Sequence, residues 1–251
     1  MAEREVRLDL VIPIYNEAHV LERSVHDLMA AVERFDLPPW RVVVMDNGST
    51  DGSRGVGEAL EARHPGRVRY QRLERKGRGI ALRTTWSGTD AALSLYMDVD
   101  LSTGLEAVPQ VVELLEDGAD VVTGSRLHPR ARTERCLQRE ILSRGYNLLV
   151  GLLFQRRGFD DAQCGFKGVR VAGVRRLLPF VVNDHWFFDT ELLILAEAFG
   201  MDVRSVPVRW VEDTDSRVRI AGTVWEDLKG LARLRRTLGG ARREWRSEFA
   251  H

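Results

Sequence analysis

Short apolar runs alternate with helix-like stretches through the first half of the chain, and this alternation constrains the fold more than any other feature. Most of the runs are rich in Val, Leu and Ile and contain few polar residues. Nearly continuous apolar strands are typical of a parallel sheet that helices cover on both faces. The expected strands cover residues 8–14, 41–45, 68–70, 91–97 and 120–125, and helical patterns lie near 17–35 and 106–115. We therefore predict an α/β protein with an open, mostly parallel sheet and helices on both faces.

The second half of the chain changes character without a clear linker, so we predict one domain over residues 1–221. Residues 222–251 are predicted to form a basic amphipathic helix at its C-terminal end. Apolar side chains of this segment recur at helical spacing, at Val224, Trp225, Leu228, Leu231, Leu234 and Leu238. Patterns before it indicate helices near 137–154 and 189–199 and strands near 166–169 and 203–210.

Two segments have the amphipathic character of helices that lie on a membrane surface. One is the basic C-terminal segment, which suits an anionic membrane or the groove of a partner protein. The other is the apolar run 148–154, which Arg156 and Arg157 follow. Either segment could instead pack against its own domain, and the pattern leaves both outcomes open.

The balance of charge excludes a general attraction for nucleic acid, because 37 Lys and Arg oppose 37 Asp and Glu. The N-terminal residues have no apolar signal core, and no stretch approaches the roughly 20 apolar residues that cross a bilayer. Cys136 and Cys164 show neither metal-ligand spacing nor a disulfide framework, so both are expected to be packing residues. We expect a cytoplasmic protein at the cytoplasmic face of a membrane; self-association into a homo-oligomer stays open.

Polar clusters follow three of the expected strands directly. They are Tyr15-Asn16-Glu17, Asp46-Asn47 and Asp98-Val99-Asp100. Each has an ordinary alternative role, since Asn16 and Asp46 are also suitable helix caps. Ligands of open α/β sheets bind outside the carboxyl ends of the strands, so three such clusters together predict a binding site. Asp98 and Asp100 would offer hard oxygen ligands to Mg²⁺ or Mn²⁺.

The order and spacing of these motifs resemble the family 2 glycosyltransferases of GT-A fold, a Rossmann-like architecture. The resemblance is carried by residues 12–17, 46–52 and 98–100. It implies a nucleotide-sugar donor, a UDP- or GDP-hexose, whose diphosphate a cation holds at Asp98 and Asp100. Donor contacts are then expected from two groups of residues. They are Pro13, Tyr15, Glu17 and Asp46 at the base and ribose, and the glycine-rich turn Lys76, Gly77, Arg78 and Gly79 at the diphosphate.

A narrower resemblance points to the polyprenyl-phosphate glycosyltransferases, the dolichyl-phosphate glucose and mannose synthases. It is carried by residues 124–126, by Arg139 with Ser143, and by residues 161–167, 188–191 and 215–217. The Gln-Cys-Gly-Phe-Lys run is closer to the glucosyl branch. The resemblance implies a polyprenyl phosphate as acceptor. The residues expected to bind its phosphate are Arg126, Arg139, Ser143 and Arg217.

Four positions depart from the pattern of that family. Asn47 replaces an acid, which removes a charge near the nucleotide, and Arg75 replaces an amide before the glycine-rich turn. Ser102 stands where mannosyl relatives often have a Gln metal ligand. Arg217 replaces the commoner Lys, which keeps the charge and changes the geometry of phosphate binding.

The implied reaction is inverting transfer, in which an acceptor oxygen attacks the anomeric carbon and a nucleoside diphosphate leaves. Asp98, Asp100, Arg126 and Asp189 are its candidate catalytic residues. A phosphate acceptor is already ionised and needs no general base, so Asp189 would then orient basic side chains. Transfer to a sugar or small-molecule hydroxyl, with Asp189 as the base, is the alternative function. A non-catalytic nucleotide-sugar binding protein is a second alternative.

Three residues beside these motifs have two interpretations each. Lys167 could close the donor site or flank a core strand. His185 and Trp186 precede the segment that carries Asp189, where an aromatic ring could line a sugar pocket. For Trp186, packing is the commoner role of such a residue.

Overall fold

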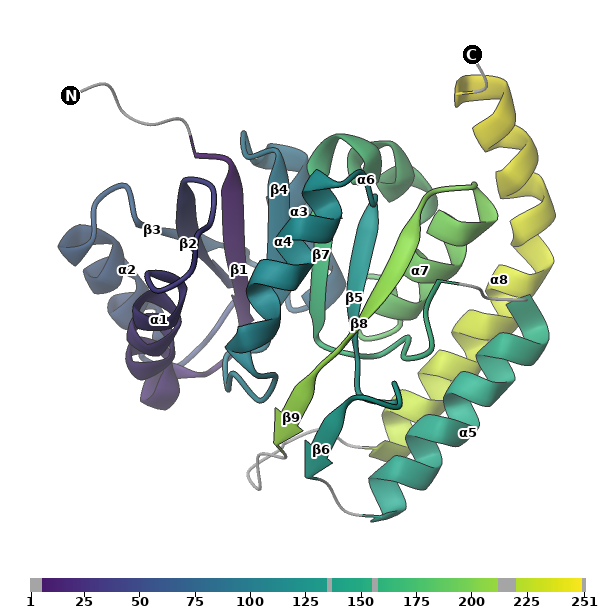
Figure 1. Ribbon diagram of the computed structural model, residues 1–251, viewed down its shortest axis with the longest axis horizontal. Coiled ribbons are helices and arrows are strands. Elements are labelled where there is room, and N and C mark those ends of the chain that lie inside the picture. The colour runs from purple at the N-terminus through teal and green to yellow at the C-terminus, as the bar shows by residue number, and fades with distance from the viewer. Residues whose placement is uncertain (1–5, 135–136, 155–157, 212–219, 250–251) are drawn as a thin grey trace.

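The computed structural model describes residues 6–134, 137–154, 158–211 and 220–249. Seven strands form one sheet in the order β3-β2-β1-β4-β7-β5-β8 (Figure 1). The strands are β1 (Leu8–Ile14), β2 (Trp40–Asp46), β3 (Val68–Arg72), β4 (Leu93–Met97), β5 (Val121–Ser125), β7 (Phe166–Arg170) and β8 (Val203–Pro207). Every neighbouring pair is parallel except the two that β7 makes, with β4 and with β5. The predicted open, mostly parallel sheet is confirmed.

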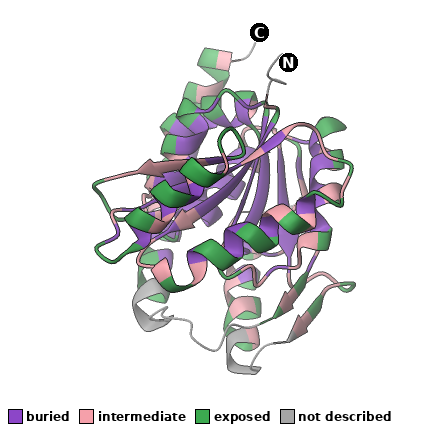
Figure 2. Cartoon of the chain, turned by 90° about the vertical axis from the view of Figure 1, so that its left-hand side faces the viewer, coloured by how far each residue is buried: buried purple, intermediate pink, exposed green. Residues whose placement is uncertain are grey.

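Helices cover both faces of this sheet. They are α1 (Ala18–Val32), α2 (Ser53–Arg63), α3 (Arg78–Gly88), α4 (Val108–Glu116), α5 (Leu137–Phe154), α6 (Val171–Leu177), α7 (Phe188–Ala198) and α8 (Ile220–Phe249). Single 3₁₀ turns precede α4 at Leu105–Ala107 and follow α6 at Leu178–Phe180. Figure 2 shows the buried strands between helices whose outer sides are exposed.

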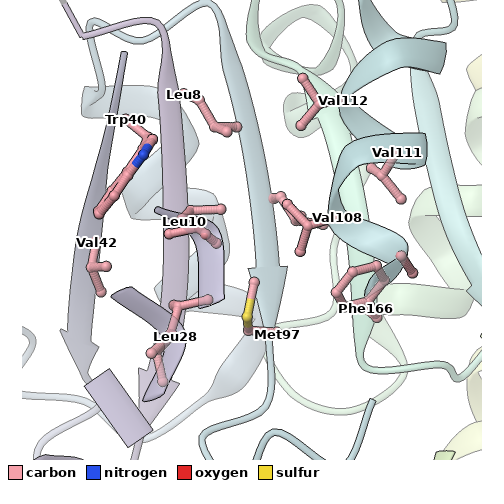
Figure 3. Close-up of a cluster of buried hydrophobic side chains, with 14 of the residues drawn as sticks. Leu8, Leu10, Leu28, Trp40, Val42, Met97, Val108, Val111, Val112 and Phe166 are labelled. Atoms are coloured by element: carbon pink, nitrogen blue, oxygen red, sulfur yellow. The ribbon is translucent and has the colours of Figure 1, made fainter. Parts of the chain in front are cut away.

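Alternate residues of the central strands enter two separate hydrophobic cores. Leu8 and Leu10 of β1 pack with α1 and α4, as the close-up in Figure 3 shows. Val11 of the same strand faces the opposite core, which α3, α6, α7 and α8 cover. Because successive side chains of a strand point to opposite faces, a strand such as β1, which is apolar except for Asp9, can be buried only when both faces are covered.

The strand register brings the predicted polar clusters to one edge of the sheet. Ile14 at the end of β1 pairs with Asp46 at the end of β2, and β4 lies on the other side of β1. The clusters that follow β2, β1 and β4 therefore lie side by side, as parallel strands require. Since β7 is antiparallel, its first residues and not its last reach this edge, where Phe166 pairs with Met97.

The prediction of a single strand at 203–210 is wrong in one respect, because this segment forms two strands. β5 ends at Ser125 opposite Pro207, so the main sheet offers no partner to the residues that follow. The chain continues as β9 (Arg209–Val211), which pairs with β6 (Arg132–Glu134) in a separate two-stranded sheet. Neither β6 nor α6 was expected from the pattern, because both are too short to show a period.

The C-terminal helix α8 lies beside α5 and packs on α7 (Figure 1). Leu231, Leu234 and Leu238 of its apolar stripe are buried, so this part docks on its own domain. Trp225 and Leu228, nearer its start, are exposed. Among the described residues, no helix is both long and apolar enough to cross a bilayer.

Candidate active site

The loops after β1 and β2 are joined by hydrogen bonds from short polar side chains. Asn16 has a left-handed backbone, with φ of 59°, and its Oδ1 accepts from the Thr50 amide at 2.7 Å. Ser49 Oγ accepts from the Asn16 amide at 2.9 Å, and Ser53 Oγ accepts from the Glu17 amide at 2.9 Å. Asn adopts this conformation more readily than most residues do, which suits it to the turn. The predicted donor residues Tyr15 and Glu17 therefore stand on a loop with a fixed backbone.

Asp46 is fully buried at the floor of these loops. Its Oδ1 accepts from the Ser49 amide at 2.7 Å. Its Oδ2 accepts from the Tyr70 hydroxyl at 2.6 Å and pairs with Arg72 Nη1 at 3.2 Å. Both carboxylate oxygens thus accept hydrogen bonds from protein groups, and the bond from the Ser49 amide stabilises the loop after β2. A direct contact of Asp46 with a nucleotide stays a prediction.

The glycine-rich turn lies against the segment that leads into α7. A Cβ on Gly77 would come within 2.5 Å of the Asp184 carbonyl oxygen, and one on Gly79 within 2.8 Å of the Asn183 carbonyl oxygen. The Ile80 amide donates to the same Asp184 carbonyl at 3.1 Å. Glycine is required here because the two backbones touch. The turn also carries Lys76, whose Nζ lies 3.8 Å from the ring centroid of Tyr15.

Arg78 is the central cation of the site. Its Nη2 lies 3.4 Å from Asp98 Oδ1 and 3.4 Å from Asp189 Oδ2. The guanidinium carbon is 5.1 Å from the ring centroid of Tyr96 and 5.0 Å from that of Trp186, and Nη2 donates to the Tyr96 hydroxyl at 3.1 Å. Burial acts to lower the pKa of Arg78, but Asp98, Tyr96 and Asp189 outweigh it, so its pKa is raised and the cation is kept.

Asp189 is held by three side chains and is almost completely buried. Tyr96 donates its hydroxyl to Asp189 Oδ1, and Lys167 Nζ lies 3.2 Å from the same oxygen. Arg78 engages Oδ2, as described above. Lys167 is itself fully buried on β7, so it flanks a core strand and also reaches the site. Asp189 thus contacts two basic side chains and a hydroxyl, and both sequence interpretations of its role stay predictions.

Asp98 and Asp100 stand at the mouth of the site. The side chain of Asp98 is 46% exposed and that of Asp100 is also open, with its Oδ1 accepting from the Ser102 amide at 2.9 Å. Loss of solvation raises the pKa of Asp98. The nearby charges of Asp100 and Asp189 raise it further, and Arg78 opposes the shift. A cation bound at this pair would relieve that unfavourable charge.

Gly165 gives the Asp98 carboxylate its room. A Cβ at this position would lie 1.9 Å from Asp98 Oδ2 and 3.0 Å from Arg78 Nη2. The described residues contain no group of three or more His, Cys, Asp or Glu side chains that could hold a metal ion alone. Mg²⁺ and Mn²⁺ are commonly held by one or two carboxylates, with substrate phosphates and water completing the shell. Asp98 and Asp100 fit that arrangement.

Arg126 is fixed by a buried carboxylate. Its Nε lies 2.7 Å and its Nη2 2.9 Å from the two oxygens of Asp161, and its backbone amide donates to Oδ2 at 3.1 Å. Burial acts to raise the pKa of Asp161, but Arg126 outweighs it and holds the pKa below its ordinary value. Asp161 therefore orients the guanidinium of Arg126, and binding of a phosphate would use the remaining N–H donors of Arg126.

The other expected acceptor residues are only partly described. Ser143 lies on α5, and its buried Oγ has no hydrogen-bond partner within the described chain. Arg139 lies on the same helix, four residues before Ser143 and one helical turn away, but its side chain lies outside the described residues. Arg217 lies outside them entirely. Their roles stay predictions.

Sequence reasoning missed Tyr96, Gly165 and above all Asp227. Asp227 lies on α8, is almost completely buried, and its Oδ2 accepts from the Gln163 side-chain amide. Burial raises the pKa of Asp227 to about 7, against the opposing hydrogen bond from Gln163, with Glu226 and Asp189 adding to the shift. Its heptad spacing was a usable signal, because Asp227 continues the buried stripe Leu231, Leu234 and Leu238.

Cys164 is buried beside this loop, and burial raises the pKa of its thiol to about 12. The thiol therefore stays protonated near neutral pH, as the prediction of a packing residue requires. Cys136 lies outside the described residues.

Comparison with known proteins decides the family. The model of glycosyl transferase family 2 matches residues 9–178, more than half of the chain. This chain belongs to glycosyl transferase family 2. The match ends before α7 and α8, so Asp189 and Asp227 lie beyond it.

Named relatives within the family include archaeal and eukaryotic enzymes. Glycosyltransferase AglD of Haloferax volcanii is 34% identical over 216 residues, which cover 85% of this chain and 34% of that protein. A dolichyl-phosphate beta-glucosyltransferase of Trichomonas vaginalis is 28% identical, covering 88% of this chain and 68% of that protein. The dolichyl-phosphate beta-glucosyltransferase of Saccharomyces cerevisiae is 26% identical, covering 87% and 71%.

Solved structures share the fold. Glucosyl-3-phosphoglycerate synthase from Mycobacterium tuberculosis, in complex with Mn²⁺, UDP and glucosyl-3-phosphoglycerate, aligns with a TM-score of 0.63 at 19% identity. The alignment covers 94% of this chain and 80% of that one. The same synthase in complex with Mn²⁺ and UDP-glucose aligns with a TM-score of 0.65 at 18% identity, covering 92% and 79%. The glycosyltransferase is thus of GT-A fold, as the motifs implied.

Proposed function

We propose that this glycosyltransferase moves a hexose from a nucleotide sugar to a polyprenyl phosphate, with inversion at the anomeric carbon. Relatives that carry the name dolichyl-phosphate beta-glucosyltransferase align with 85–92% of the chain. The chain spans only 34% of AglD and about 70% of those glucosyltransferases, so the proposal concerns the catalytic part that they share. Glucose is the sugar that these names favour, and the synthase of similar fold solved with UDP-glucose favours UDP as its carrier. Mannose from GDP-mannose is the competing pair.

The observation that carries the proposal is the engaged state of Asp189. A hydroxyl acceptor loses its proton during attack, so it needs a carboxylate that is free to accept it. Both oxygens of Asp189 already contact Tyr96, Lys167 and Arg78. A phosphate acceptor brings an ionised oxygen and needs cations in place of a base. The site supplies those cations: Arg78 contacts Asp98 and Asp189, Lys167 contacts Asp189, and Arg126 contacts Asp161.

The described side chains divide the work of this reaction. A divalent cation at Asp98 and Asp100 would act as a Lewis acid that stabilises the departing diphosphate. Arg78 stands beside Asp98 and would add positive charge on the same side. Asp189 keeps Arg78 and Lys167 in place through its two oxygens. Arg126, aimed by Asp161, would receive the acceptor phosphate.

We also propose that the paired helices α5 and α8 bring the enzyme to a membrane surface, where the tail of a polyprenyl phosphate lies. Both helices expose large apolar side chains next to basic ones, the pattern of a peripheral membrane contact. On α5 the exposed residues are Ile141, Leu142, Leu148 and Leu152, and on α8 they are Val224, Trp225 and Leu228. These are the two segments for which the sequence predicted a membrane contact, and they pack together in the fold.

A donor and acceptor panel tests the proposed function. UDP- and GDP-hexoses are offered with a short polyprenyl phosphate and Mg²⁺ or Mn²⁺, and lipid-linked product is measured by mass spectrometry. Product is expected, and Asp98→Ala should abolish it. Transfer only to sugar hydroxyls would refute the proposal.

The role of Asp189 is tested with the same assay. Asp189→Asn keeps a side chain of the same shape, so part of the turnover should remain if no proton has to be abstracted. Asp202→Asn, a change to an exposed carboxylate paired with Arg204, serves as the matched control. Near-complete loss of turnover in folded Asp189→Asn protein would favour a base and a hydroxyl acceptor.

A further inference from the structure

Trp186 is a large aromatic side chain left exposed at the mouth of the site. It is 42% exposed, and it lies two residues before the start of α7 at Phe188. Packing, the commoner role for such a residue, therefore does not account for it. A large apolar side chain that remains exposed beside a binding site is typical of one that a ligand covers.

The position of Trp186 relative to the metal-binding carboxylates is defined through one shared neighbour. Arg78 has its guanidinium carbon 5.0 Å from the indole centroid and its Nη2 3.4 Å from Asp98 Oδ1. The hexose of a nucleotide sugar is bonded to the outer phosphate, the group that a cation at Asp98 and Asp100 would hold. The indole is therefore an exposed aromatic surface next to the place where the hexose would lie.

The loop that carries Trp186 is fixed before any ligand binds. Glu191 Oε2 accepts from the amides of Val182 and Asn183 at 3.0 and 2.7 Å. Asp184 accepts the Ile80 amide and lies against Gly77. An aromatic platform on such a loop loses little conformational freedom on binding, which favours affinity.

Arg78 does not need Trp186 for its own position. Tyr96 covers it at 5.1 Å, and Asp98 and Asp189 each hold it at 3.4 Å. The indole thus has binding surface beyond what the cation uses. The C–H groups of a hexose ring carry small positive charges, and the face of an indole is negative, so the two attract when they stack.

We infer that Trp186 is the stacking platform for the hexose of the donor, and so a specificity-determining residue. This inference rests on the proposed function, because it requires a nucleotide sugar at Asp98. It predicts that Trp186 contributes to the affinity for the sugar part of the donor and not to that for the nucleoside diphosphate.

Calorimetric titration of the full chain with UDP and with UDP-glucose, in the presence of Mn²⁺, tests this inference. The quantity of interest is the ratio of the two affinities, which isolates the hexose. Trp186→Ala should reduce the ratio about tenfold, the size of one aromatic contact of about 1.4 kcal/mol. Trp186→Phe should keep most of it. Val182→Ala, an exposed change on the same loop, should leave the ratio and the UDP affinity as they are.

Two results would overturn the inference. One is that Trp186→Ala leaves both affinities as they are; the other is that it weakens UDP and UDP-glucose binding equally, which would mean that Trp186 acts only by holding Arg78. The ratio is unchanged in both cases, and the UDP affinity tells them apart. In either case, product formation by the wild-type chain would leave the proposed function intact. If the donor panel selects GDP-mannose, the same comparison is made with GDP and GDP-mannose.

Discussion

Gly165→Ala is the smallest change that should disable the site while leaving the fold in place. The added methyl would lie 1.9 Å from Asp98 Oδ2, where an ordinary van der Waals contact starts at 3.4 Å. The gap must therefore grow by about 1.5 Å. Gly165 lies between Cys164, which is buried, and Phe166, which begins β7, so its backbone has little freedom to retreat. The Asp98 carboxylate, which is partly exposed, is the group that moves.

The expected loss follows from that displacement. A misplacement of about 1 Å in a catalytic group costs about 100-fold in rate, which corresponds to about 2.7 kcal/mol of transition-state stabilisation. We expect kcat/KM to fall by at least about 100-fold. Mn²⁺-dependent binding of the donor should weaken as well, because Asp98 would no longer face the diphosphate in line with Asp100. Global stability should change little, since Asp98 can turn toward solvent.

The assay combines three measurements on the same preparation. They are lipid-linked product formation, calorimetric binding of UDP with and without Mn²⁺, and the midpoint of thermal unfolding. Gly55→Ala is the matched control, because a Cβ there would meet nothing within 4 Å. Gly55 lies inside α2, where Ala is favoured over Gly by about 1 kcal/mol, so the control should be active and slightly more stable. Wild-type metal-dependent binding and turnover in folded Gly165→Ala protein would refute the reasoning.

Three further predictions follow from the same structure. Since burial raises the pKa of Asp227 from 3.8 to about 7, the native state binds its proton more tightly than the unfolded chain, and stability falls as pH rises between these values. Between pH 4 and 8, this should lower the unfolding free energy of the wild type by up to about 4 kcal/mol, and Asp227→Asn should remove that fall. The unfolding free energy is measured with urea at each pH, and the same pH dependence in the variant would contradict the prediction. Asp161→Ala should lower the unfolding free energy by about 3 kcal/mol, because it leaves the buried Arg126 unpaired; a loss below about 1 kcal/mol would show that solvent satisfies Arg126. Leu152→Glu with Trp225→Glu should reduce flotation with anionic liposomes at unchanged melting temperature, whereas equal flotation would exclude this surface.

Most strands of the sheet could be predicted from local sequence patterns. An apolar run such as 8–14 must be buried on both sides, so it reports a strand covered by helices before any partner is known. The polar residues after β1, β2 and β4 then had to meet, since parallel neighbours place their ends at one edge. These are properties of short segments, and short segments are what a sequence shows directly.

The partners within the site depended on contacts between distant parts of the chain. Lys167 reaches Asp189 because β7 runs against its neighbours, so that its first residues lie beside the ends of the others. No local signal gives the direction of a strand. Arg78 and Asp189 come together because the glycine-rich turn packs on the segment before α7. Asp46 is fully buried because Tyr70 and Arg72 on β3 cover its carboxylate, and no local signal gives that pairing.

The sequence by itself determined the α/β sheet, the three polar strand ends and the carboxylate pair Asp98 and Asp100, because hydrophobic periodicity and turn chemistry act within a few residues. The tertiary structure decided how those groups are placed and which side chains they contact. It placed Gly165 against Asp98 to leave room for its carboxylate, and it enclosed Asp189 between two cations. Such roles depend on burial and on pairing across the sheet, and both exist only once the chain has folded.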